Sequence, residues 1–198
     1  MAKIMCPYCG KRNTVPIIYG NLGAADFEVQ QRGELQLGGC CIREDMAKCF
    51  CTDCREEFDR QSGVLSMWTG FSFSVGGPVG SSHSVVIRRG ETDWPVRYLF
   101  STGNDDVKLD RKSFENAPAI QILDDEQWEA FCGKLKKCYI TEWKKEYRDD
   151  DIIDGTYWHL QIDSLTEVPL VIYGKNDYPP YFNKLLRILS DLTGKTIA

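Results

Sequence analysis

Two Cys-x-x-Cys pairs constrain the fold of this chain more than any other feature of its sequence. The first pair is Cys6 and Cys9, and the second pair is Cys51 and Cys54. Each pair presents two sulfur atoms from one tight turn, and two such turns supply the four ligands of a tetrahedral metal site. The spacing therefore predicts one structural zinc ion bound by Cys6, Cys9, Cys51 and Cys54.

The residues beside the two pairs favour the same interpretation. Pro7 stiffens the first turn, and Gly10 suits the position after the second ligand, where the backbone often needs a positive φ. Arg55 occupies the corresponding position of the second turn, which is therefore the less ideal half. Phe58 follows Cys54 closely in the chain, and we expect its ring to cover the metal site.

Four sulfur ligands predict a closed site, because a catalytic zinc ion keeps an open position beside three protein ligands. The alternative of a redox dithiol fits a single Cys-x-x-Cys pair better than two pairs that bound one short segment. Cys49 offers an alternative ligand beside Cys51, but it is one register off the expected turn. Cys40 and Cys41 could form a reactive pair, although loop or packing thiols are the simpler interpretation. Whether these three cysteines contribute to the metal site stays open from the sequence.

Charge and cysteine content limit the classes of function. The 198 residues carry a formal net charge of −5, whereas proteins that bind nucleic acid normally show an excess of Lys and Arg. Residues 1–62 contain 8 Lys and Arg against 9 Asp and Glu, so the metal region is not basic either. The odd count of nine cysteines, the lack of an apolar signal segment and the lack of a membrane-length apolar stretch predict a cytoplasmic protein without a membrane partner.

The segment between the cysteine pairs predicts short elements only. Residues 15–19 read as a strand, and residues 24–32 as a short helix that Gly33 ends. Residues 35–37 alternate between apolar and polar side chains, and residues 55–58 suit a closing strand. These elements are too small for a core of their own, so we expect the metal to hold them together.

A set of residues in the first 60 positions forms a recognisable pattern: Cys6 to Gly10, Pro16 to Gly20, Gly33, Leu37 to Cys40, Cys51, Cys54 and Phe58. This pattern resembles a zinc-ribbon segment of small uncharacterised bacterial proteins. The resemblance implies a zinc-ribbon fold and a bacterial origin, and it brings no activity with it.

The composition changes at Ser62, so we expect a zinc-ribbon domain over residues 1–61 and a second domain over residues 62–198. Asp124 reads as a helix N-cap, with Gln127 completing a capping box. An apolar stripe that includes Cys132 and Cys138 then follows at helical spacing. Strands are predicted over 64–75, 84–88, 96–101, 156–163 and 169–173, and a last helix begins at Pro179 and Pro180.

These elements predict an α+β protein. The expected order in the second domain is three strands, a helix, two strands and a helix. Trp143 and Tyr147 also lie one helical turn apart. Strands joined by hairpins favour an antiparallel sheet with the helices packed on one face.

Few residues outside the cysteine pairs suggest chemistry. The chain has two histidines, His83 and His159, and His159 lies near Asp163 on the polar face of its strand. A surface histidine is the simpler interpretation of His159. The glycine-rich run 76–80 lacks the ending of a phosphate-binding loop, so a hairpin turn is expected there. The acidic run 149–151 lacks the spacing of a calcium loop and suits a solvated turn.

Three functions compete. We favour a non-enzymatic interaction or adaptor protein that binds another protein, in which a structural zinc ribbon is joined to an α+β module. An enzyme with a site around His159 is the first alternative. A ribbon protein associated with nucleic acid is the second alternative, and the net negative charge disfavours it.

Overall fold

The structure, a computed structural model, describes residues 4–43, 46–59, 68–77, 80–102, 117–152, 154–165 and 168–197. The chain divides into two compact units, Met1–Gly63 and Val64–Ala198. Both units combine helix and sheet, which confirms the predicted α+β class. The predicted junction between residues 61 and 62 lies outside the described residues, and the independence of the two domains stays a prediction.

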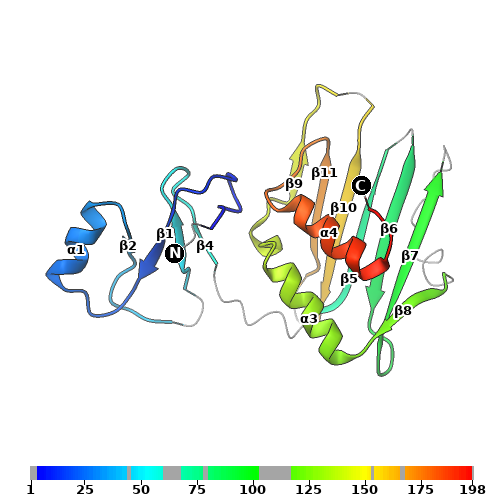
Figure 1. Ribbon diagram of the computed structural model, residues 1–198, viewed down its shortest axis with the longest axis horizontal. Helices are drawn as coiled ribbons and strands as arrows, with labels where there is room; N and C mark the ends of the chain where they lie inside the picture. Colours follow the sequence, from blue (N-terminus) through cyan, green and yellow to red (C-terminus); the bar gives the residue numbers. More distant parts are fainter. Residues whose placement is uncertain are drawn as a thin grey trace. The chain divides into compact units, whose positions relative to one another are not determined.

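The first unit is built on a small sheet with one helix beside it (Figure 1). Within the described residues, its strands lie in the order β2-β1-β3-β4, with β1 parallel to β2 and antiparallel to β3. The elements are β1 (Thr14–Ile18), α1 (Ala24–Gln31), β2 (Gln36–Leu37), β3 (Cys49–Cys51) and β4 (Glu57–Phe58).

Local chemistry explains where α1 begins and ends. The carboxylate of Asp26 accepts a hydrogen bond of 2.8 Å from the backbone N–H of Gly23, which satisfies a donor at the start of the helix. Gly33 follows the helix with φ of 72°, a conformation that suits glycine because it has no Cβ. The predicted helix over 24–32 is confirmed to within one residue.

The first unit buries little apolar surface. Among its described residues, the buried apolar side chains other than cysteine are Val15, Ile17, Leu35, Ala47 and Phe58. No side chain of α1 is buried. A core of this size offsets only part of the conformational entropy lost on folding, so the unit needs a further source of stability.

The second unit is a sheet covered by helices on one face. The described strands form one sheet in the order β8-β7-β6-β5-β10-β11-β9, and Figure 1 shows α3 and α4 crossing the same side of it. The elements are β5 (Trp68–Gly76), β6 (Ser81–Arg88), β7 (Trp94–Thr102), β8 (Ala119–Leu123), α3 (Asp125–Lys136), a 3-10 helix (Ile140–Glu142), β9 (Glu146–Arg148), β10 (Tyr157–Ser164), β11 (Leu170–Lys175) and α4 (Phe182–Thr193).

The two edge strands of this sheet, β8 and β9, were not predicted. The structure adds β8 before α3 and β9 after it, so the described order is four strands, a helix, three strands and a helix. The helical interpretation of Trp143 and Tyr147 is wrong, because Tyr139 adopts a φ of 55° after α3 and Tyr147 lies in β9. Their shared contact is the Trp158 ring, at centroid distances of 6.2 and 5.8 Å. β9 pairs in parallel with β11, a partner distant in sequence, so no local pattern marks it.

Aromatic rings dominate the core between sheet and helices. Trp94 stacks on Trp128 of α3 with ring centroids 4.0 Å apart. Trp158 of β10 packs on Phe182 of α4 at 4.9 Å. The predicted capping box of α3 is confirmed, because the Asp124 carboxylate accepts from the backbone N–H of the third helical residue at 2.8 Å. This helix therefore starts where its own sequence dictates, and its apolar stripe meets the sheet.

Gly174 and Gly133 lie in different environments, so replacement by alanine is expected to change the free energy of unfolding in opposite directions. An added Cβ at Gly174 in β11 would overlap the Trp158 indole, whose N–H is already fixed by a 2.9 Å hydrogen bond to the Asp177 carbonyl. Gly174→Ala is therefore expected to lower the free energy of unfolding by about 1–3 kcal/mol. Gly133 lies inside α3 with open space around the position of an added Cβ. Gly133→Ala is therefore expected to raise the free energy of unfolding by about 0.5–1 kcal/mol. Urea denaturation of both variants measures the two signs, and equal signs would contradict the packing described here.

The division into two units predicts that the second can fold alone. A fragment of residues 64–198 is expected to melt cooperatively, because its sheet and helices supply their own core. Circular dichroism during heating provides the measurement. A fragment without a cooperative transition would show that the units share a core.

Candidate metal centre

The pairing of β1 with β3 brings the two cysteine pairs together. The first pair directly precedes β1, and the second pair forms the turn between β3 and β4. In the antiparallel register, Thr14 at the start of β1 lies opposite Cys51 at the end of β3. The backbone N–H of Thr52 also donates to the Asn13 carbonyl at 2.9 Å. The strand register therefore places one turn beside the other.

The two cysteine turns, Cys6–Gly10 and Cys51–Arg55, have the same backbone form. In the first turn the N–H of Gly10 donates to the Cys6 carbonyl at 3.0 Å, and in the second the N–H of Arg55 donates to the Cys51 carbonyl at 2.9 Å. Gly10 has a φ of 72°, and Arg55 has a φ of 64°. Arg55 therefore adopts the left-handed conformation that glycine adopts in the first turn, as its position in the sequence suggested.

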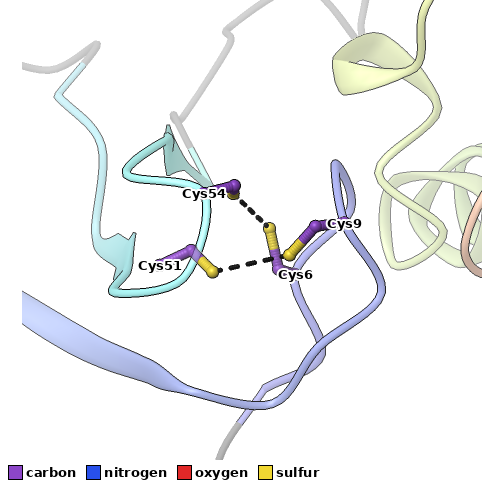
Figure 2. Close-up of side chains that lie close together, drawn as sticks. All are labelled: Cys6, Cys9, Cys51 and Cys54. Atoms are coloured by element: carbon purple, nitrogen blue, oxygen red, sulfur yellow. Dashed lines mark hydrogen bonds between the residues drawn. The ribbon is translucent and has the colours of Figure 1, made fainter.

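The four sulfur atoms lie at the separations that a tetrahedral metal site needs (Figure 2). The Sγ atoms of Cys6 and Cys54 are 3.6 Å apart, those of Cys9 and Cys51 are 3.7 Å apart, and all four lie within 4.8 Å of one another. Four sulfurs bound at about 2.3 Å at the corners of a regular tetrahedron would lie about 3.8 Å apart. A disulfide needs a separation of about 2.05 Å, and all four cysteines are free thiols.

Backbone amides act to stabilise negative charge on the sulfur atoms of Cys6 and Cys51. Burial raises the pKa of the Cys6 thiol, while hydrogen bonds from the backbone amides of Cys9 and Tyr8 act to lower it. Burial also acts to raise the pKa of Cys51, but hydrogen bonds from the equivalent amides of the second turn and from neighbouring thiols outweigh it, so that pKa is lowered. Amides that point at a sulfur favour the thiolate, which is the form that binds metal.

The donor set fits zinc. Four thiolates are a common ligand set of structural zinc ions, and a zinc ion with four thiolates carries a charge of about −2. A cation from one turn approaches an acid from the other, since the Lys11 ammonium lies 3.8 Å from the Asp53 carboxylate. The described residues thus supply a complete set of ligands for one metal ion.

The structure separates the other cysteines from this cluster. Cys49 lies on the same face of β3 as Cys51 and is buried, and its burial raises the pKa of its thiol. Cys40 and Cys41 are exposed. None of the three belongs to the group of sulfurs that could hold a metal ion among the described residues. Phe58 is completely buried opposite Cys49 in the β3–β4 pair.

His159 lies on the face of the second sheet that faces away from α3 and α4, with Ser74 and Tyr173 as its cross-strand neighbours. It is half-buried rather than a freely exposed surface residue, and burial lowers its pKa. The Asp163 carboxylate, a candidate partner for it, accepts a hydrogen bond of 2.9 Å from the Arg88 guanidinium. Asp163 is thus paired with Arg88.

The acidic run is part of an ion-pair network. The Asp150 carboxylate lies 3.1 Å from the Arg148 guanidinium and 3.5 Å from the Lys175 ammonium. The arginine hydrogen bond holds the pKa of Asp150 below its usual range. The charge of Asp150 is thus balanced by two cations, and residues 150–151 form a turn, in agreement with the prediction.

His83 is buried, an environment that was not predicted from the sequence. Its Nδ1 atom lies 2.8 Å from the Tyr98 hydroxyl, and its ring packs on Phe100 at a centroid distance of 5.0 Å. Burial lowers the pKa of His83 and raises that of Tyr98. The alternation of β6 offered a signal, because His83 has the same parity as the core residues Val85 and Ile87.

No family model, no curated protein and no solved structure matches this chain. The resemblance of residues 1–60 to a zinc-ribbon segment is supported by the cysteine cluster. Functional inference therefore depends on the geometry of the chain itself.

The equivalent positions of the two cysteine turns predict opposite effects of substitution. Gly10→Ala is expected to weaken the first turn by about 1–2 kcal/mol, because alanine is strained at a positive φ. Arg55→Gly is expected to strengthen the second turn by about 0.5–1 kcal/mol. This gain is the difference between the backbone strain that glycine relieves and the extra conformational entropy that glycine has in the unfolded chain. Competition for zinc with a chromogenic chelator measures both effects, since binding and folding of such a unit are coupled. Weaker zinc retention in Arg55→Gly would contradict the assigned geometry.

Proposed function

We propose that residues 1–61 form a zinc ribbon in which Cys6, Cys9, Cys51 and Cys54 hold one structural zinc ion. The observation that carries this proposal is the convergence of four sulfurs within 4.8 Å from two turns of matching backbone form. The small apolar core of the unit supports it, because bound metal then supplies the missing folding free energy. Four protein ligands leave no position for a reacting water molecule.

We further propose that the whole chain is a non-enzymatic interaction or adaptor protein of the bacterial cytoplasm. All nine cysteines, each among the described residues, are free thiols, which suits a reducing compartment. No helix within the described residues has the length and apolar character needed to cross a membrane. The bacterial origin follows from the ribbon resemblance.

The second sheet offers a surface for a protein partner. Its helices pack on the face that carries Trp158 and Leu160, and the opposite face carries Tyr157 and Tyr173. These two tyrosines lie on adjacent strands, and each is 48% exposed. Tyrosine anchors protein interfaces well, because its ring buries a large area at low entropic cost while its hydroxyl stays hydrogen-bonded.

The zinc assignment predicts one zinc ion per chain in protein prepared without added metal. Cys54→Ser is expected to lose that ion and the secondary structure of the first unit, because the remaining three thiolates no longer close the tetrahedron. Cys40→Ser is the matched control, since it removes an exposed thiol outside the cluster and should retain full zinc content. Elemental analysis, circular dichroism and limited proteolysis provide the measurements.

The same variants distinguish a structural ion from a catalytic one. A structural ion predicts that Cys54→Ser gains protease cleavage sites before residue 60, while the second unit keeps its cooperative melt. Metal loss that leaves the first unit folded and protease-resistant would refute the structural role. Metal-free wild-type protein with an intact first unit would refute the zinc site itself.

The interaction role predicts a partner that depends on the exposed tyrosines. Replacing Tyr157 and Tyr173 by serine is expected to weaken binding of a protein co-purified from the native host by about 2 kcal/mol or more, roughly 30-fold, because such anchors dominate interface energy. Phe27→Ser is the control, since Phe27 is an aromatic residue that is 52% exposed on α1 of the first unit and is not part of this sheet. Quantitative mass spectrometry of the purified complexes measures the difference. Equal recovery with both variants would exclude this face as the interface.

A further inference from the structure

The nine cysteines fall into three environments, and the cysteines of the third environment have no assigned role. Four cysteines form the candidate metal centre. Three more are buried, and burial raises the pKa of each, to about 12 for Cys132 and about 11 for Cys138. Cys40 and Cys41 remain as exposed thiols outside the cluster, and they are neighbours in the chain.

The backbone before this pair is anchored to β1. The N–H of Gly38 donates to the Ile18 carbonyl at 2.9 Å, and the N–H of Gly20 donates to the Gly39 carbonyl at 2.9 Å. The Tyr19 ring lies so close to Gly38 that an added Cβ would overlap it. Ile42, which follows the pair, is 75% exposed although its side chain lies beside Gly20. The two thiols are therefore presented to solvent from a fixed point of the sheet.

The adjacency of Cys40 and Cys41 limits their joint chemistry. Across a trans peptide their Cα atoms are about 3.8 Å apart, and the peptide bonds of the described residues include no cis bond. Disulfides normally join Cα atoms about 4.4–6.8 Å apart, so a direct bond between these sulfurs is disfavoured. An acceptor atom placed between the two sulfurs lengthens the bridge and removes this constraint.

We propose that Cys40 and Cys41 form a dithiol site for a soft, thiophilic acceptor of the trivalent arsenical class. Soft thiolate ligands select soft acceptors, and after the first sulfur binds, the second reacts within the same molecule at a high effective concentration. With an arsenoxide, each sulfur forms a bond to arsenic, and the arsenic–oxygen bond breaks. The oxygen leaves as water with the two thiol protons, and no atom changes its oxidation state. This site is independent of the proposed zinc centre.

Phenylarsine oxide is a direct probe of the site. We expect the full-length protein to bind one equivalent at the pair, and Cys40→Ser and Cys41→Ser each to bind one equivalent fewer than the wild type. Ile42→Ser is the matched control, because it changes an exposed neighbour without removing a thiol, and it should bind as the wild type does. Intact-mass spectrometry counts the adducts, and elemental analysis of the same samples follows zinc. Excess monothiol should leave the adduct in place, whereas ethane-1,2-dithiol should remove it.

Two outcomes would overturn the proposal. Single-serine variants that bind as many equivalents as the wild type would exclude the pair, and an adduct that a monothiol displaces would show that only one sulfur binds. The number of adducts can also be compared between wild type and variants in protein without zinc. In that protein the thiols of the four-cysteine cluster add the same number of adducts to the wild type and to every variant. A failure of the zinc assignment therefore appears in the metal analysis and leaves the difference between variants readable.

Discussion

The antiparallel pairing of β1 with β3 is the constraint on which the candidate metal centre depends. Each Cys-x-x-Cys turn can form from its own short segment, but four sulfurs meet only because Thr14 lies opposite Cys51. A shift of one residue in this register would reverse the faces of the strand and separate the turns. Strand pairing and metal binding therefore support each other, as expected of a unit with few buried apolar residues.

The second unit is stabilised by the burial of aromatic and aliphatic side chains against one face of its sheet. Stacked rings such as Trp94 on Trp128 bring the helices to that face. The opposite face carries polar residues and exposed tyrosines, which is the usual arrangement of an antiparallel sheet with one solvated side. This asymmetry is what makes the tyrosine-bearing face available to a partner in the proposed adaptor role.

The cysteines illustrate how environment decides the chemistry of one side chain. In the cluster, amide hydrogen bonds oppose the effect of burial on the thiol pKa and favour metal binding. In the helical core of the second unit, burial outweighs the backbone hydrogen bond to Cys132, so the pKa of this thiol is raised and the thiol stays protonated. Cys40 and Cys41 are exposed and combine solvent access with adjacency, which is the basis of the proposed dithiol site.

Features whose cause lies within a few residues can be predicted from the amino-acid sequence: the two cysteine turns, the capping box at Asp124 and the alternating strands around Leu160. Which segments meet depends on the folded chain. Tertiary contacts add the edge strands β8 and β9, separate Cys49 from the four-sulfur cluster and bury His83 against Tyr98. The physical reason is that hydrogen bonding within a turn is local, whereas the parallel pairing of β9 with β11 and the burial of a histidine depend on partners distant in the chain.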